Sequence, residues 1–364
     1  MSCDCADRVD EVTIDYERAL LLPCAYGNAV AHGELRSEPE DFVVREHLGF
    51  DADDAGDHWL LTVRKRGANT HWVAKQLAKL ADIHPRDVGF AGLKDRNAVT
   101  EQAFTLSVRS AFTGEWEGVT GDGFEVIRAR RHRRKLKRGA LKGNDFEITV
   151  RNFNGDPAAL ADRLNRIAKE GVPNYFGPQR FGRDLSNLKR AVAMFAGVKV
   201  HDRLERGFAL SAARAAVFNA VLAQRVTDGS WNQLREGDVA NLDGSNSIFD
   251  VAGVDALLTD RCAALDIHPT GPLWGRGELR SKGDVRELEL AIVSEHRALC
   301  DGLERVDLEH ERRSLRVAVQ GFEHTLNGTD LTLRFRLGRG AFATTVLHEI
   351  LEGAFTISTP ETED

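Results

Sequence analysis

The side chain with the clearest potential for chemistry is Asp95, in the stretch GFAGLKDRNAVTEQ at residues 89–102. Lys94 and Arg96 flank it, two glycines precede it, and an alternating run begins at Ala103. This pattern predicts a strand, a tight turn with an acid at its tip and a second strand, which can hold a side chain over a cleft. The flanking cations favour the ionised form, so we expect a carboxylate at neutral pH. A solvated turn aspartate is the alternative.

A dense basic run, RARRHRRKLKR at residues 128–138, holds six arginines, two lysines, one histidine and no acid. The net charge of −7 does not point to a polyanion, but attraction depends on such local fields. Phosphate contacts by this run would make binding strongly salt-dependent. The predicted contacts are Arg131, Arg133, Arg134 and Lys135, and the alternative is a solvated basic loop.

Three further side chains have types suited to holding a nucleobase. Asn144 and Phe146 follow a flexible glycine pair directly after the basic run; an amide can bond a base edge, and an aromatic face can stack on a flipped base. Phe342 precedes a predicted helix N-terminus, where it could stack on a base while the helix end meets a phosphate. The alternatives are a turn residue for Asn144 and core packing for both phenylalanines.

The stretch GVPNYFGPQRFG at residues 171–182 interleaves aromatic, amide and guanidinium groups. Such a mixture is typical of a surface that contacts bases and backbone. It is equally typical of a hinge whose aromatic side chains close the interface between two domains. The residues concerned are Asn174, Tyr175, Phe176, Gln179, Arg180 and Phe181.

Other site classes have little support in the sequence. The 12 histidines are scattered, and His348-Glu349 lacks the second histidine of an HExxH zinc site, so we expect no metal. There is no phosphate-binding glycine motif, GxSxG turn or CxxC pair. Five cysteines without paired spacing favour free thiols in a reducing cytoplasm, and we expect neither a membrane span nor a secretory signal. The kind of site that the sequence still supports is a reactive carboxylate beside a basic surface.

The elements that must position these residues follow from the apolar pattern. Asn69 or Thr70 should cap a helix in which Val73, Leu77 and Leu80 form an apolar stripe, which Trp72 could extend. Strands are predicted at residues 42–46, 58–65, 103–108, 124–129, 146–151 and 331–337.

Two more helices are predicted, one before and one after a mostly helical middle part of the chain. Asp156 and Pro157 should start a helix that Gly171 ends, and another is predicted over about 343–351. Past Gly171 mostly helical segments follow, clearest over 210–226, before the strand pattern returns. The order indicates an α+β fold in which one mainly antiparallel sheet is interrupted by an inserted domain, after an acidic N-terminal extension of about 30 residues.

Five long motifs, in the same order, resemble those of the TruD family of tRNA pseudouridine synthases. Together they span nearly the whole chain after about Gly33, which makes them far more specific than any short pattern. They are PEDFVVRE (39–46), GFAGLKDRNAVTEQ (89–102), RRHRRKLKRGALKGNDF (130–146), VPNYFGPQRFG (172–182) and GAFATTVLHEI (340–350).

The resemblance implies a fold and an activity. The family isomerises uridine 13 in the D-arm of tRNA to pseudouridine, so tRNA is the expected partner, with no metal or organic cofactor. The fold implied is an α/β pseudouridine-synthase domain over residues 31–171 and 317–364, split by an inserted TRUD domain over residues 172–316. We expect a cytoplasmic monomer.

The resemblance also assigns roles to residues. It maps the nucleophile onto Asp95 and substrate contacts onto Phe42, Asn144, Phe146 and Phe342. Related synthases keep a basic residue near the catalytic acid, for which Arg36 is the candidate.

These residue types suit a mechanism in which the uridine is flipped out of its stack and attacked by Asp95 at ribose C1′ or uracil C6. The detached uracil would rotate and rejoin through C5 inside an aromatic-lined pocket. Two other functions remain open: a non-catalytic RNA-binding module or folding helper, and a glycosidase. The glycosidase needs a second carboxylate near Asp95, and only Glu101 is available nearby.

Overall fold

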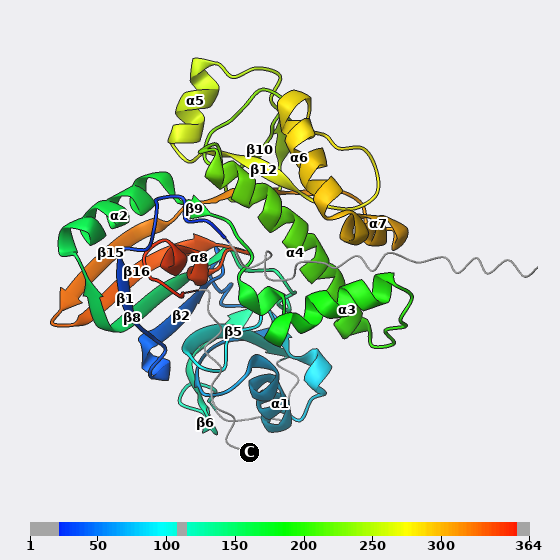
Figure 1. Cartoon of the computed structure of the whole chain (residues 1–364). Helices are drawn as coiled ribbons and strands as arrows, with labels where there is room; N and C mark the ends of the chain where they lie inside the picture. Colours follow the sequence, from blue (N-terminus) through cyan, green and yellow to red (C-terminus); the bar gives the residue numbers. More distant parts are fainter. Residues whose placement is uncertain (1–21, 108–114, 355–364) are drawn as a thin grey trace, which may run out of the picture. The chain divides into compact units, whose positions relative to one another are not determined.

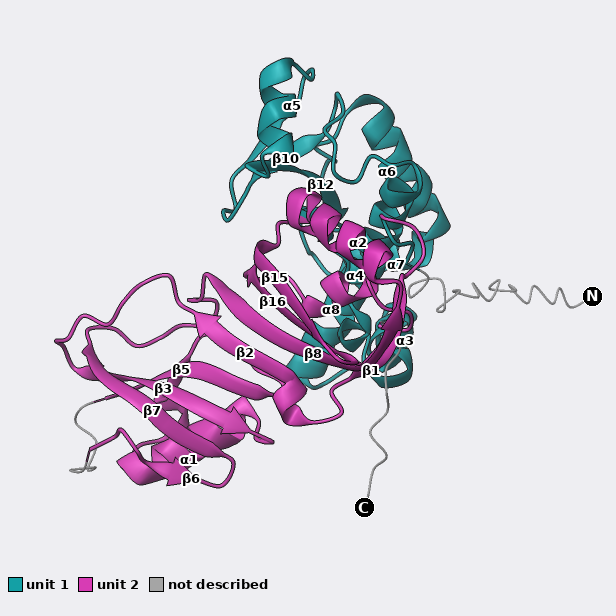
Figure 2. Ribbon diagram, turned by 90° about the vertical axis from the view of Figure 1, so that its left-hand side faces the viewer, with its two compact units in different colours: residues 1–25, 173–316, 355–364 teal, residues 26–172, 317–354 magenta. Residues whose placement is uncertain are grey.

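The computed structural model describes residues 22–107 and 115–354, which form two compact units. Unit 2 comprises residues 26–172 and 317–354, and unit 1 contains residues 173–316 (Figure 2). The chain crosses between the units within β9 (Val172–Pro173) and β14 (Arg316–Val317). Most of the predicted N-terminal extension, and Val108 at the end of a predicted strand, lie outside the described residues.

Unit 2 is built on a ten-stranded sheet whose main path has the order β15-β16-β8-β2-β5-β3-β7-β6 (Figure 1). Of its described pairings only β2–β5 is parallel, so the predicted α+β fold with a mixed, mainly antiparallel sheet is confirmed. The strands are β1 (Ala31–Leu35), β2 (Phe42–His47), β3 (His58–Arg66), β4 (Gly89–Phe90), β5 (Val99–Ser107), β6 (Thr120–Gly121), β7 (Phe124–His132), β8 (Gly143–Gly155), β15 (Gln320–Asn327) and β16 (Asp330–Gly338).

Two breaks between strands shape this sheet. Along one edge of β8, β2 pairs from Gly143 to Ile148 and β1 pairs beyond it, from Val150 to Gly155. Along one edge of β5, β2 pairs with residues 99–101 and β4 with residues 104–105. Between β1 and β2 the chain leaves the sheet in a loop that carries Arg36. After β4 it leaves the sheet in a second loop, which carries Asp95 and leads into β5.

Helix α1 (Thr70–Ala81) covers the β3–β5–β7 part of the sheet. Asn69 caps it by accepting a hydrogen bond from the Trp72 backbone N–H at 2.8 Å, as predicted. Val73 and Leu77 are buried as expected, but Leu80 and Trp72 are each 41% exposed. The prediction for Leu80 and Trp72 was wrong because alanines at helical spacing (Ala74, Ala78 and Ala81) complete the buried face.

The other helices of unit 2 begin where the sequence predicts. Helix α2 (Pro157–Glu170) starts after Asp156, whose carboxylate accepts from the Ala158 N–H, and ends at Gly171 with φ of 79°. Helix α8 (Ala343–His348) is shorter than predicted, because the chain turns after His348 and its Ile350 carbonyl accepts from Val30.

Unit 1 contains helices and a four-stranded sheet of order β11-β10-β12-β13, which the sequence did not predict. Its helices are α3 (Ser186–Phe195), α4 (Arg203–Thr227), α5 (Ala256–Ala263), α6 (Gly283–Glu295) and α7 (Arg297–Arg305). Its strands are β10 (Val239–Leu242), β11 (Ile248–Asp250), β12 (Ile267–Leu273) and β13 (Glu311–Ser314). In the described parts of both units no helix is long and apolar enough to cross a membrane.

The aromatic side chains of residues 171–182 are buried in unit 1. Phe176 packs edge-on against Phe218 at 5.5 Å, and the Arg313 guanidinium lies over its ring. Tyr175 is 1% exposed and Phe181 is fully buried. The hypothesis of an exposed base-contact surface was therefore wrong for these aromatic residues, which belong to the core.

Candidate active site

The loop that carries Asp95 is anchored by buried polar side chains. The Lys65 ammonium, 1% exposed on β3, donates to the Asp95 carbonyl at 2.7 Å and to the Ala68 carbonyl at 2.9 Å. Gln102 donates to the Gly92 carbonyl at 2.7 Å. Because a buried donor paired with a carbonyl holds the backbone in place, the hydrogen bonds from Lys65 and Gln102 fix the loop that positions the Asp95 side chain.

The second loop brings Arg36 to the Asp95 carboxylate. Its Nη2 donates to Asp95 Oδ2 at 3.0 Å, and its guanidinium lies over the Phe42 ring, 4.3 Å from the centroid. The Arg36 backbone has φ of 61°, a left-handed conformation that costs energy for a non-glycine residue and tends to occur at functional sites. Buried Asp41 secures this loop by accepting from the Glu38 N–H at 3.0 Å and from Arg151 at 2.8 Å.

A buried ion pair sets the orientation of the Asn144 amide. The Lys94 ammonium donates to Glu46 Oε1 at 2.9 Å and to Asn144 Oδ1 at 2.8 Å. The Lys94 and Glu46 side chains are only 7% and 1% exposed, and Glu46 also accepts from the Ala103 N–H at 3.0 Å. Because Lys94 occupies the amide oxygen, the Asn144 NH₂ group is left to donate elsewhere.

The predicted aromatic residues lie at the same part of the sheet. Phe42 and Phe146 are cross-strand neighbours on β2 and β8, with ring centroids 6.2 Å apart, and Phe146 stacks on Phe335 at 5.5 Å. Both Phe42 and Phe146 are buried and form a wall beside Arg36. Phe342 follows β16, whose last residue Gly338 pairs with Gly143, so it lies at the end of the sheet that holds Asn144.

The first half of the basic run is engaged with its own surroundings. Arg130 forms an ion pair with Asp54. Arg131 donates to the Gly56 carbonyl and lies 5.2 Å from the Trp59 ring, which leaves only part of its guanidinium for a ligand.

The second half of the run lies beside the segment that leads into Asp95. Arg133, Arg134 and Lys135 are exposed, and the Gly139 N–H donates to the Ala91 carbonyl at 2.7 Å. The Lys135 ammonium donates to the Arg86 carbonyl at 2.8 Å. The run therefore borders the Asp95 loop.

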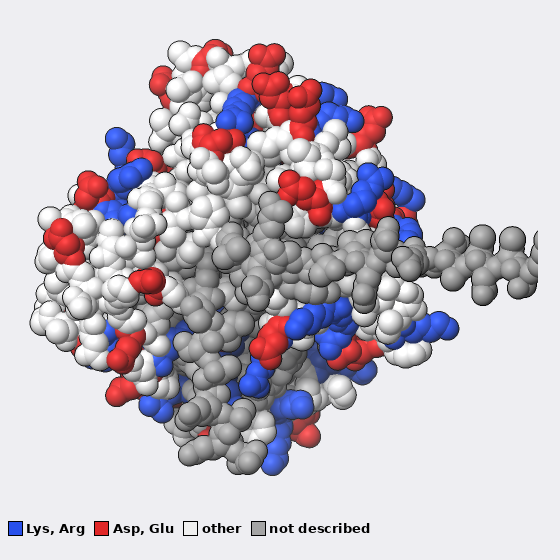
Figure 3. Space-filling model, in the orientation of Figure 1, with Lys and Arg blue, Asp and Glu red and all other residues white. Residues whose placement is uncertain are grey.

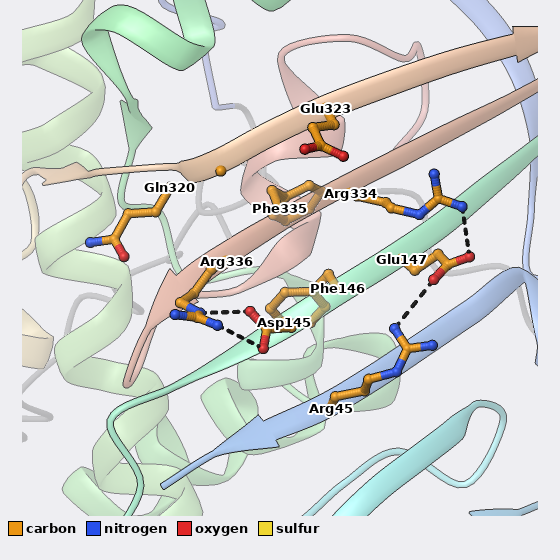
Figure 4. A pocket seen from close by; sticks show the side chains of 10 residues that line it. Arg45, Asp145, Phe146, Glu147, Gln320, Glu323, Arg334, Phe335 and Arg336 are labelled. Carbon is orange, nitrogen blue, oxygen red and sulfur yellow. Dashed lines mark hydrogen bonds and ion pairs between the residues drawn. The ribbon is translucent and has the colours of Figure 1, made fainter. Parts of the chain in front are cut away.

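A groove of about 360 Å³ lies on the other face of the unit 2 sheet, away from Asn144 and Asp95 (Figure 4). Most of its charged side chains are paired with one another: Arg336 bonds Asp145, and Glu147 lies between Arg334 and Arg45. The hydrogen bond from Arg334, with that from Arg45, lowers the Glu147 pKa. Because side chains alternate along a strand, these carboxylates point away from the face of Asn144 and Asp95.

Glu101 also points to that opposite face, where Arg64 bonds it at 3.0 Å. It cannot face Asp95 across a substrate, so Glu101 is excluded as the second carboxylate that a glycosidase would need. Among the described residues no cluster of three or more metal-ligating side chains is present.

Sequence reasoning missed Lys65 and Glu46 and the position-setting contacts of Lys94. Lys65 carried a signal, because it continues the buried alternation of Leu61 and Val63 on β3. Burial lowers the Lys65 pKa to about 8, against the opposing effect of the Asp95 carboxylate. Hydrogen bonds to the Asp95 and Ala68 carbonyls offset this cost, so Lys65 helps to position the Asp95 loop.

Comparison with known proteins places the chain in a family. The model of the family tRNA pseudouridine synthase D (TruD) matches residues 25–193 and 185–350. A tRNA pseudouridine synthase D from Xanthomonas campestris pv. campestris is 45% identical over 347 residues, covering 91% of this chain and 95% of its own. The Methylococcus capsulatus protein of the same name is 44% identical, covering 91% and 94%.

The fold agrees with a solved structure. The crystal structure of a putative tRNA pseudouridine synthase D from Methanosarcina mazei superposes with a TM-score of 0.70 at 22% identity, covering 92% of this chain and 97% of that one. The chain belongs to the tRNA pseudouridine synthase D (TruD) family.

Proposed function

We propose that this protein converts a uridine of tRNA to pseudouridine, with Asp95 as the nucleophile. The observation that carries the proposal is the Asp95 carboxylate, held by Arg36 at 3.0 Å beside the wall of Phe42 and Phe146, in a chain of this family. The family resemblance supports uridine 13 of the D-arm as the target.

The side chains suggest how the reaction would run. A uridine flipped from its stack would enter between Asp95 and Asn144, at a cost of a few kcal/mol. The Asn144 NH₂, oriented by Lys94, would donate to a uracil carbonyl, and Phe342 would stack on the ring. Arg36 would keep the Asp95 carboxylate pointed at the nucleotide.

The bonds balance without any further reagent. Asp95 attacks at ribose C1′ or uracil C6, the C1′–N1 bond breaks, a C1′–C5 bond forms, and the bond to Asp95 breaks to return the free carboxylate. The hydrogen on C5 leaves as a proton and N1 gains one. Nothing is oxidised, reduced or hydrolysed, so the proposal includes no cofactor.

The remaining parts of the proposal concern organisation. We assign residues 31–171 and 317–364 to the catalytic domain and residues 172–316 to an inserted TRUD domain. We also propose that the protein acts as a cytoplasmic monomer on tRNA.

Mapping pseudouridine in tRNA from cells with and without this protein tests the proposal. We expect one position, uridine 13, to lose pseudouridine in cells that lack the protein and to regain it on expression of the wild type, but not of Asp95→Asn. Identical maps with and without the protein would overturn the proposal.

A further inference from the structure

A second cavity, of about 390 Å³, lies next to the Asp95 loop in unit 2. The short strand β4 and the second half of the basic run form its walls. Its lining includes four groups that carry or can carry positive charge, His71, Arg86, Lys135 and Arg138, around the ring of Phe90.

No acidic residue lines this cavity. Among the described residues, no carboxylate lies within ion-pair distance of Arg86, Lys135 or Arg138, whereas arginines elsewhere in unit 2, such as Arg130 and Arg334, are paired with acids. On the face shown in Figure 3 positive and negative side chains are likewise interspersed. Burial without a compensating anion lowers the Arg138 pKa. The cavity is therefore a local positive site that an anion would stabilise.

Close packing builds the cavity. Gly89 lets the basic run approach β4, because a Cβ there would lie 2.7 Å from the Leu136 carbonyl oxygen. The Lys135 ammonium is held by the Arg86 carbonyl at 2.8 Å, and the Arg138 guanidinium lies 3.8 Å from the Phe90 ring centroid. Lys135 and Arg138 are thus held in place before any ligand binds, which reduces the entropy lost on binding.

The cavity lies within reach of nucleotides that flank the reacting one. Phe90 precedes Asp95 by only five positions in the sequence, so the two are at most roughly 18 Å apart along the chain. The cavity is therefore within reach of a phosphate that lies a few nucleotides from the target uridine along the RNA strand.

We propose that this cavity binds a backbone phosphodiester of the RNA strand that carries the target uridine, with Arg86, Arg138 and Lys135 as the contacts. The inference deepens the proposed function and rests on it. Binding a phosphate here fixes the register of the strand, so that the correct nucleotide reaches Asp95.

A chemical double-mutant cycle tests the proposal. In a tRNA, single phosphates within about five nucleotides of uridine 13 are replaced one at a time by neutral methylphosphonates at 2′-O-methyl nucleotides, each compared with the same nucleotide carrying an ordinary phosphodiester. Binding affinity and the rate of pseudouridine formation are measured for the wild type, Arg86→Gln, Arg138→Gln and a control, Arg334→Gln. The control loses the same charge on the opposite sheet face, where Glu147 already pairs it.

We expect one linkage at which the methylphosphonate weakens wild-type binding about tenfold. At that linkage Arg86→Gln and Arg138→Gln should bind the ordinary tRNA more weakly than the wild type, and the methylphosphonate should weaken their binding by less than tenfold, because each variant has already lost one of the three contacts. Their salt slope should be smaller than that of the wild type. Arg334→Gln should behave as the wild type. If the affinity losses caused by the arginine variant and by the methylphosphonate simply multiply at every linkage, the two groups do not interact and the inference is overturned. If an arginine variant and a methylphosphonate are coupled in binding but the wild type forms no pseudouridine, the phosphate site is supported and the proposed activity is refuted.

Discussion

Replacing Lys65 with methionine should uncouple the Asp95 loop from the sheet while leaving the fold intact. Methionine keeps the length and apolar stem of lysine, so the buried volume changes little. It removes the ammonium that donates to the Asp95 carbonyl at 2.7 Å and to the Ala68 carbonyl at 2.9 Å. The loop then keeps its other hydrogen bonds, such as the one from Gln102 to the Gly92 carbonyl.

Two opposing effects determine the change in stability at pH 7. Hydrogen bonds from a charged donor contribute about 1.5–3 kcal/mol each, so the two together are worth about 3–6 kcal/mol. Against this, the Lys65 pKa of about 8, compared with 10.5 for an exposed lysine, means that burying the charge costs about 3 kcal/mol. The free energy of unfolding should therefore fall by only about 0–3 kcal/mol, whereas the rate of the chemical step should fall about 10- to 100-fold through misplacement of the carboxylate.

The pH dependence of this difference has a definite sign. The folded pKa lies below the unfolded one, so the unfolded chain binds more protons between about pH 8 and pH 10.5. The wild type should therefore gain stability relative to Lys65→Met as pH rises through this window, by up to about 3 kcal/mol. Below pH 8 the difference should be constant.

Urea unfolding at pH 7, 8, 9 and 10, with single-turnover rates at pH 7, measures both quantities. Lys75→Met, an exposed position on α1, is the matched control and should change neither. A stability difference that stays flat from pH 7 to 10 would refute the desolvation of Lys65. An unchanged single-turnover rate would refute its role in positioning Asp95.

Three further predictions concern other contacts. Lys94→Met leaves the buried Glu46 carboxylate unpaired and should lower the free energy of unfolding by about 3–5 kcal/mol, whereas adding Glu46→Gln should restore part of it in a urea double-mutant cycle. Gly89→Ala should cost about 1–3 kcal/mol in thermal or urea unfolding, because its Cβ would meet backbone and side-chain atoms at under 3 Å. Neutralising Arg133 and Arg134 together should reduce the slope of log affinity against log salt by about two for tRNA.

Each of these predictions has a control in the chain. A double variant of Lys94 and Glu46 whose effects simply add would contradict their coupling. Gly207→Ala, at a position with open space within 4 Å, should not destabilise the protein; equal losses at Gly207 and Gly89 would argue against the steric explanation. Arg130→Gln should alter the salt slope less than either exposed arginine, since Asp54 already pairs Arg130. An unchanged slope in the Arg133 and Arg134 variant would remove that part of the run from the interface.

Much of unit 2 could be predicted from local patterns. The strand on each side of the Asp95 loop, the cap at Asn69 and the stop at Gly171 follow from turn chemistry and from period-2 or period-3.6 alternation. The family motifs added which side chains to examine. These features are local in sequence, which is why sequence reasoning found them.

The contacts that complete the site depend on long-range strand register. Arg36 meets Asp95 only because β1 and β2 meet end to end along β8, and β2 and β4 do so along β5. No local pattern shows where a strand breaks against a distant neighbour. The burial of the aromatic residues near Phe176 has the same origin, since their packing partners come from segments far along the chain.

The most direct test of the central claim is tritium release from tRNA labelled at C5 of uridine. Formation of the C1′–C5 bond expels the hydrogen on C5, so each turnover releases one tritium to water. With purified protein in excess, the wild type should release tritium from one uridine per tRNA, and Asp95→Asn should release none while binding the tRNA with unchanged affinity. Release by Asp95→Asn at the wild-type rate, or none by the wild type, would contradict the account.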